Sequence, residues 1–179
     1  MDYPLWAYFP RQVAAPPWVP EFLEAIRLKI DAIDSRKHRK LESDQVVAEV
    51  RSNLVSRGWE IEAGKKAIQK ISRPVLFGDN GQVRVKQELD GWHPEHKIVL
   101  EIESGRAVLG NAIYRDIVRA SLVTDAEFLA LGVRIDYTHK SGTKDVSHAD
   151  FEKTRDTFDS IFASGRLTLP FKGVLVFGW

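Results

Sequence analysis

The chain has 179 residues, of which 44% are hydrophobic and 28% are charged, and its formal net charge is +1. These values predict a globular domain with a sizeable core, and they exclude general disorder and a uniformly basic coat for nucleic acid. The absence of cysteine excludes disulfides, thiolate zinc sites and a cysteine nucleophile. We see no signal peptide pattern and no run near the ~18 apolar residues of a membrane span, so we expect a cytoplasmic protein without membrane contact.

Residues 1–20 are rich in proline and also contain Trp6 and Trp18, which predicts an irregular, extended N-terminal arm. The remaining residues, 21–179, are then expected to form the folded domain. The first helix is predicted from Glu21 to Ile33, where apolar residues recur at three- and four-residue intervals. The basic run 36–40 interrupts this pattern before the next helix begins.

Helices and strands alternate along the rest of the chain. The further expected helices span residues 43–58, 108–123 and 148–162. The expected strands span residues 59–62, 75–77, 82–90, 97–103, 128–137 and 174–177. Turns are expected at 78–81 and 91–94, and a polar loop at 139–145. This order predicts one α/β domain with a mixed central sheet flanked by helices.

Two of the expected strands carry carboxylates in sheet-like sequence. Glu88 and Asp90 share one face of their strand, and Glu101 and Glu103 share one face of the next. A tight hairpin with its turn at 91–95 would leave Asp90 near the turn and Glu101 further away, whereas a twisted or bulged pair would bring them together. Converging carboxylates form an all-oxygen site of the kind Mg²⁺ binds. The alternative is a solvated sheet face with charges paired across strands.

The segments "ELD" (88–90), "VLEIES" (99–104) and "GNAIYRDIVRASLV" (110–123) resemble the PD-(D/E)XK nuclease superfamily. In that family an Asp at the end of one strand is followed by (D/E)-X-K on the next. The resemblance is greatest to restriction endonucleases of the BglII and BamHI type, in which the usual Lys is replaced and E-X-E can result. It covers roughly residues 46–137, and Leu89 stands where the motif has Pro.

The resemblance implies a restriction endonuclease-like fold and a Mg²⁺-dependent DNA endonuclease, similar to type II restriction enzymes, that hydrolyses phosphodiester bonds. Asp90 and Glu101 would ligate Mg²⁺, for which Mn²⁺ can substitute, and Glu103 would act on the attacking water. Glu49, on the preceding helix, would be an auxiliary metal ligand. No organic cofactor is implied, and no P-loop or dinucleotide-binding motif is present. A palindromic DNA target would require a homodimer.

The missing motif Lys leaves a second interpretation open, a catalytically inactive nuclease-fold domain that binds nucleic acid or a protein partner. Lys97 is four residues from Glu101, or ~13 Å along a strand, which is too far to replace it. A third interpretation is a structural domain that docks through its N-terminal arm.

Positive side chains near the acidic motif suggest contacts with DNA. Asn111, Arg115 and Arg119 are spaced by four residues and form one polar stripe on the predicted helix. Together with Arg106 they are predicted to bind phosphates. The alternative is a solvated helix on which Arg119 pairs loosely with Asp116.

Overall fold

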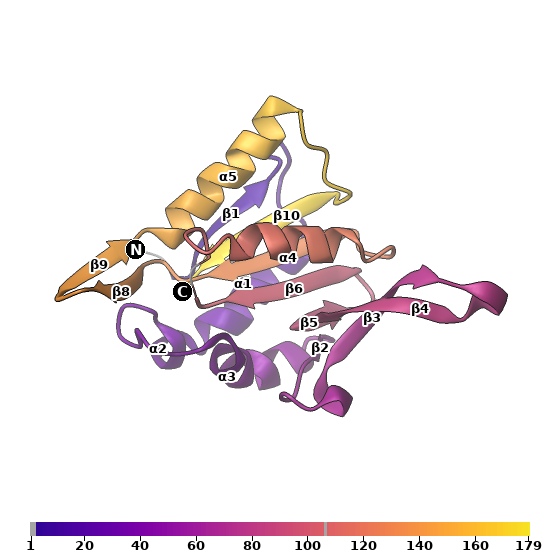
Figure 1. The fold of residues 1–179 in the computed structure, drawn as a ribbon, viewed down its shortest axis with the longest axis horizontal. Coiled ribbons are helices and arrows are strands. Elements are labelled where there is room, and N and C mark those ends of the chain that lie inside the picture. Colours follow the sequence, from indigo (N-terminus) through magenta and orange to yellow (C-terminus); the bar gives the residue numbers. More distant parts are fainter. Residues whose placement is uncertain (1–2, 106) are drawn as a thin grey trace.

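The centre of the molecule is a six-stranded mixed sheet in the order β1-β10-β7-β6-β5-β2 (Figure 1). The computed structural model describes residues 3–105 and 107–179. Strands β6, β7 and β10 run parallel, and β1, β5 and β2 extend the sheet with antiparallel pairs. The strands of this sheet are β1 (Leu5–Phe9), β2 (Glu60–Ile61), β5 (Gly91–His93), β6 (Ile98–Glu103), β7 (Phe128–Val133) and β10 (Gly173–Gly178). The predicted mixed α/β domain with flanking helices is thereby confirmed.

Helices cover both faces of the sheet, because alternate residues of each strand point to opposite sides. Ile98, Leu100 and Ile102 of β6 pack in a cluster beneath α1 and α3, whereas Val99 packs in a second cluster beneath α4 and α5. The helices are α1 (Trp18–Arg27), α2 (Ile30–Ile33), α3 (Ser43–Val55), α4 (Ala112–Ser121) and α5 (Asp150–Ser164). None of the described helices is both long enough and apolar enough to cross a bilayer.

The N-terminal segment differs from the irregular arm expected over residues 1–20. Residues Leu5–Phe9 form edge strand β1, which pairs with β10, and α1 already begins at Trp18. Pro20 does not interrupt α1, because the first turn of a helix leaves its backbone N–H groups without intrahelical partners. The helix expected to run to Ile33 instead breaks after Arg27 and resumes as the short α2.

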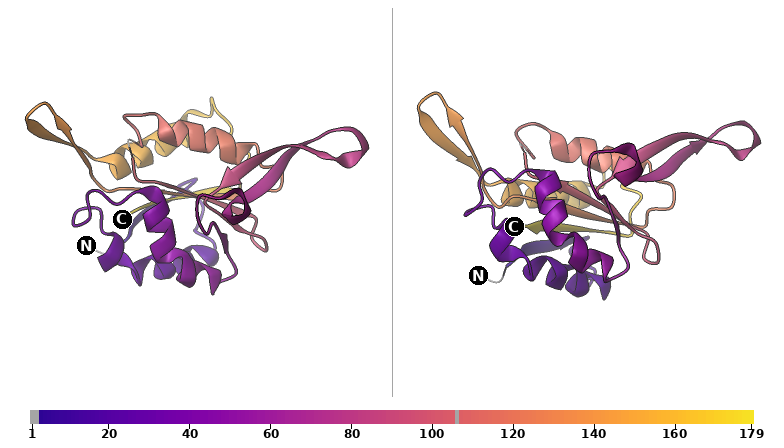
Figure 2. Two further views of the ribbon diagram at one scale, coloured as in Figure 1. Left: turned by 60° about the horizontal axis from the view of Figure 1, so that its bottom comes forward. Right: turned by 90° about the horizontal axis from the view of Figure 1, so that it is seen from below.

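Two antiparallel ribbons project from the body of the molecule (Figures 1 and 2). One is formed by β3 (Ile71–Phe77) and β4 (Val83–Leu89), with a 3-10 turn at Asp79–Gly81, as the turn signal predicted. The other is formed by β8 (Tyr137–Ser141) and β9 (Lys144–His148), where a polar loop was expected. Gly142 lies at the tip of this second ribbon with φ +65°, a conformation that glycine adopts at little cost.

Candidate active site

Asp90 and Glu101 lie side by side because of the register between β5 and β6. Gly91 pairs with Leu100 and His93 pairs with Ile98, so Asp90, one residue before β5, falls opposite Glu101. The Asp90 Oδ2 atom accepts a hydrogen bond of 2.7 Å from the backbone N–H of Ile102. The turn predicted at 91–94 was wrong: residues 91–93 form a strand, and the chain reverses at 94–97. No bulge is needed to bring the two carboxylates together.

Glu101 is buried between the sheet and α4. Its side chain is on the same face of β6 as Val99, and its partner across the parallel ladder is Leu131. Only 2% of the residue is exposed. A carboxylate in such a place is costly to desolvate unless positive charge or hydrogen bonds compensate it.

Arg119 of α4 supplies part of this compensation. Its Nη2 atom lies 2.9 Å from Glu101 Oε2 and 3.2 Å from Asp116 Oδ1, so one guanidinium serves two buried acids. Glu101 Oε1, in contrast, is buried and has no hydrogen-bond partner among the described residues. The site therefore contains a carboxylate oxygen that is positioned for a further partner.

The acids of this cluster hold their protons unusually tightly. Burial, together with the charges of Glu62 and Asp116, raises the pKa of Asp90 to about 7. Burial and the neighbouring Asp90 raise the pKa of Glu101 well above its ordinary value, although Arg119 opposes the change. Burial also raises the pKa of Asp116. The positive charge that the protein provides is thus insufficient for the number of carboxylates brought together here.

Glu103 lies at the end of β6, nearer to solvent. Its Oε1 atom accepts a 2.7 Å hydrogen bond from the Gly105 backbone N–H, and its Oε2 atom lies 3.2 Å from Arg115 Nη2. Its side chain is 16% exposed. The adjacent Ser104 is held in place because its backbone N–H donates to Ser43 Oγ at the start of α3. These contacts fix the carboxylate of Glu103 while leaving it accessible at the edge of the cluster.

The predicted phosphate-binding stripe on α4 is placed against the acids. Arg115 contacts Glu103 and Asp116, and Arg119 contacts Glu101 and Asp116. Arg115 remains 60% exposed, so it can still contact a ligand outside the cluster. Asn111 is exposed at the N-terminal end of α4, with φ +58°. Arg106 lies outside the described residues.

The structure does not bring Glu49 to the acidic pair. Helix α3 packs on the opposite face of the sheet from α4, and the Glu49 carboxylate lies 3.8 Å from Lys29 Nζ in an exposed ion pair. Lys97 is likewise occupied elsewhere, because its Nζ atom lies 3.0 Å from Glu127 Oε1. Lys97 therefore does not replace the missing Lys, in agreement with the spacing argument.

Sequence reasoning missed Glu62, which continues the acidic row across the sheet. Ile61 pairs with Gly91, so Glu62 falls beside Asp90, and its backbone N–H donates to the Asp90 carbonyl at 3.0 Å. Glu62 is buried and forms an ion pair with Lys70. The charge on Glu62 contributes to the raised pKa of Asp90. The only indication of Glu62 in the sequence was its place as a charged residue at the end of the short strand expected at 59–62.

A divalent cation fits this donor set. Within the described parts of the chain, no three His, Asp or Glu side chains gather into a ready-made metal cage. Mg²⁺ does not require one, because it usually keeps several waters and binds through one or two carboxylates together with substrate phosphates. Asp90 and Glu101 provide hard oxygen donors on one face, and one of these oxygens is buried without a partner.

Fold and site together define a mixed α/β domain with an acidic pair, of which Glu101 is buried and Asp90 is half-buried, between its sheet and helix α4. Comparisons of the chain with protein-family models, with curated proteins and with solved structures found no match.

The stability of the metal-free protein should fall as the pH rises from about 4 to about 7. In this interval folded Asp90 retains a proton that the unfolded chain has lost, so the folded state binds more protons and the free energy of unfolding decreases by up to ~1.4 kcal/mol per pH unit. Glu101 acts in the same direction. Urea unfolding in EDTA across this range measures the slope, which Asp90→Asn should reduce. Equal slopes for the variant and the wild type would contradict the assignment.

Proposed function

We propose that the cluster around Asp90 and Glu101 is the metal-dependent active site of a DNA endonuclease with a restriction endonuclease-like fold. The observation that carries the proposal is the pairing of these two carboxylates across adjacent strands, with one buried oxygen left without a partner. The helix that follows β6 supports it, because α4 supplies arginines at the same place. This arrangement agrees with the strand–strand–helix order that the nuclease resemblance implies.

The charge balance favours a cation over a purely structural cluster. Among the described residues Glu101 forms an ion pair only with Arg119, which it shares with Asp116, while Asp90 forms no ion pair and Glu62 is paired with Lys70. Burial raises the pKa of Asp90 to about 7 and also raises the pKa of Glu101, so the protein by itself does not fully favour the ionised forms of the pair. A bound divalent cation would allow these carboxylates to ionise, so metal binding and proton release should be coupled.

Asp90 and Glu101 would hold Mg²⁺, with Mn²⁺ as a substitute. When bound, the ion stabilises charge on a phosphoryl oxygen and activates water as a nucleophile near neutral pH. Glu103 orients the attacking water and can accept its proton, because its carboxylate is fixed by Gly105 and Arg115 at the solvent side of the cluster. The exposed guanidinium of Arg115 can bind the phosphate beside it.

Arg119 takes the place of the motif Lys in this proposal. Glu103 occupies the position at which the family usually has Lys. The positive charge beside Glu101 comes instead from Arg119 of α4, whose Nη2 atom lies 2.9 Å from Glu101 Oε2. Positive charge at the acidic pair is thus retained, although it comes from the helix after the strand. An inactive nuclease-fold domain is the second candidate, because both arginines are already engaged by carboxylates.

Metal titration combined with a cleavage assay tests the proposal. The wild-type protein should bind Mn²⁺ in calorimetry, release protons on binding, and cleave DNA of mixed sequence only when Mg²⁺ or Mn²⁺ is present. Asp90→Asn should lose the binding, whereas Glu49→Gln, which removes an equal charge outside the cluster, should keep it. Metal binding without cleavage of duplex or single-stranded DNA would favour the inactive domain. The absence of metal binding in the wild type would refute both the ligand assignment and the mechanism.

A further inference from the structure

The basic run Arg36–Lys40, here called the basic loop, connects α2 to α3 beside the β8–β9 ribbon. Two of its cations are neutralised locally, because Arg36 Nε lies 3.2 Å from Asp34 Oδ1 and Lys37 Nζ lies 3.0 Å from Asp31 Oδ1. Among the ion pairs of the described chain, none involves Arg39 or Lys40. The loop therefore presents two exposed positive charges at its C-terminal end that form no ion pair in the described chain.

The basic loop is held in place by a buried arginine. Arg134, only 4% exposed, donates through both terminal nitrogens to the backbone carbonyls of Arg39 and Leu41. Ser35, just before the loop, is anchored as well, since its Oγ donates to the Trp179 carbonyl and accepts from the Ile135 N–H. The conformation of the loop is thus determined by contacts with the end of β7 and with the C-terminus.

A further positive charge lies beneath the basic loop. Burial lowers the pKa of the Arg134 guanidinium, and the neighbouring Tyr137, Asp150 and Glu103 oppose this change. A polyanion on the outer side of the loop would be attracted by the exposed basic side chains. The basic loop is therefore a preformed cationic surface, and the side chains of Arg39 and Lys40 form no ion pair within the described part of the chain.

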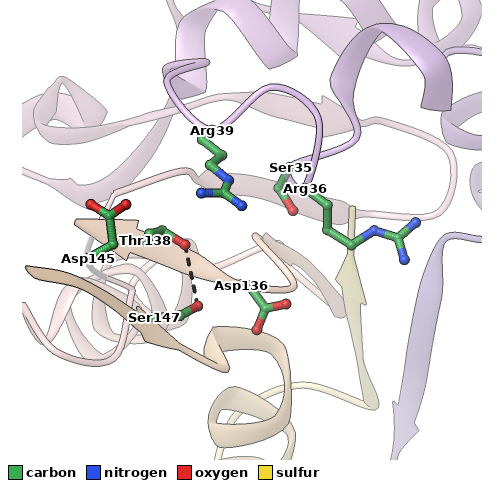
Figure 3. A pocket seen from close by; sticks show the side chains of 7 residues that line it. All are labelled: Ser35, Arg36, Arg39, Asp136, Thr138, Asp145 and Ser147. Atoms are coloured by element: carbon green, nitrogen blue, oxygen red, sulfur yellow. Dashed lines mark hydrogen bonds between the residues drawn. The ribbon is translucent and has the colours of Figure 1, made fainter. Parts of the chain in front are cut away.

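A hollow of about 260 Å³ separates the basic loop from the β8–β9 ribbon (Figure 3). Arg39 extends its guanidinium into this hollow toward the hydroxyls of Thr138 and Ser147. Thr138 Oγ1 donates to Ser147 Oγ at 3.3 Å, which leaves the Ser147 hydroxyl hydrogen available to a ligand. The carboxylates of Asp136 and Asp145 also line the hollow. A guanidinium with adjacent hydroxyl donors is a common set of contacts to the phosphate backbone of nucleic acid.

The hollow and the acidic pair are at the same end of the sheet. Glu103 pairs with Val133 in the β6–β7 ladder, so Arg134 follows at the level of Ser104. Ser43, two residues after Leu41, accepts from the Ser104 backbone N–H at 2.9 Å. A strand of nucleic acid whose phosphate lies at Glu103 can therefore continue along the basic loop.

We infer that the basic loop and the β8–β9 ribbon bind the phosphate backbone of the nucleic acid beyond the cleaved bond, with Arg39 and Lys40 as the principal contacts. This inference rests on the proposed function, because it assigns the surface that holds the substrate of the acidic site. Its chemistry is the recognition of consecutive phosphodiesters, and it does not involve the reading of base sequence.

Fluorescence anisotropy with a short labelled DNA duplex in EDTA tests the inference independently of cleavage. The double variant Arg39→Ala/Lys40→Ala should bind at least ~10-fold more weakly near physiological salt, and the slope of log K against log salt should decrease by about 2. The matched control is Arg51→Ala/Arg166→Ala, which removes the same charge from exposed positions on α3 and after α5. The control should retain the wild-type affinity and slope.

The possible outcomes distinguish DNA binding by the basic loop from the proposed cleavage at the acidic pair. Loss of affinity in the loop variant alone supports the inference, even if the wild type fails to cleave DNA and the proposed catalysis is thereby refuted. Equal binding by the loop variant and the wild type, or an equal loss in the control, would overturn it. Loop-dependent binding to anionic lipid vesicles without binding to DNA would also overturn it and would identify a membrane surface as the partner.

Discussion

Replacing Glu101 by Gln should reduce Mg²⁺-dependent DNA cleavage by ~10³-fold or more. The amide keeps the size of the side chain but removes the charge that a divalent cation requires, and a metal ion contributes several kcal/mol to stabilisation of the transition state. Folding should survive the change, because Gln has the same size as Glu101 and its amide oxygen can still accept the hydrogen bond from Arg119 Nη2. Initial cleavage rates at saturating Mg²⁺, compared with unfolding curves in EDTA, measure both effects.

Two further variants make this prediction specific to the acidic pair. Glu49→Gln should leave the cleavage rate within about twofold of the wild type, since Glu49 pairs with Lys29 on the other side of the sheet. Glu103→Gln should lower the rate while retaining metal binding, because Glu103 is assigned to the water and not to the ion. Full activity in Glu101→Gln would remove the basis for a metal site at this position.

The order of helices and strands was largely predictable because it depends on local periodicity. Apolar alternation located β4 and β6, and three- and four-residue spacing located α3, α4 and α5 close to their observed bounds. Strand β5 was not predictable in this way. Gly91-Trp92-His93 has a turn-like composition, yet it forms a strand in which Gly91 lies close to its neighbours: a Cβ atom there would lie 2.6 Å from Ile61 Cδ1 and 3.2 Å from the Glu60 carbonyl oxygen.

That single error changed the predicted geometry of the site. With the turn at residues 94–97, and not at 91–95, Asp90 moves along the hairpin to the level of Glu101. The residues of the pair were therefore identified correctly, but their direct pairing followed only from the register. Glu62 was missed for the same reason, since its position beside Asp90 depends on a ladder between segments far apart in sequence.

Helical spacing also showed which side chains share a face without showing what that face contacts. Arg115 and Arg119 do lie on one side of α4, as their spacing predicted. That side packs against the acids of β6, because Arg119 reaches a buried carboxylate that the strand itself leaves uncompensated. The charge complementarity between a strand and the helix after it is a tertiary property, and no pattern within α4 contains it.

Arg119→Met should destabilise the metal-free protein by about 2–3 kcal/mol. The substitution leaves Glu101 and Asp116 buried without their shared guanidinium. Breaking a fully buried ion pair costs ~3–5 kcal/mol, and the partial exposure of Arg119 reduces that amount. The matched control is Arg115→Met on the same helix, which should cost no more than ~1 kcal/mol because Arg115 is 60% exposed.

A double-mutant cycle with Glu101→Gln identifies the origin of the loss. If Arg119 acts by compensating Glu101, Arg119→Met should cost less by ~1 kcal/mol or more in the Glu101→Gln background, where only Asp116 remains to be compensated. Equal costs in both backgrounds would show that Arg119 stabilises the protein without compensating Glu101. The cycle also bears on catalysis, because in the proposed function Arg119 takes the place of the motif Lys. If the coupling is present, Arg119→Met should also lower the cleavage rate, whereas Arg119→Lys should restore part of both properties.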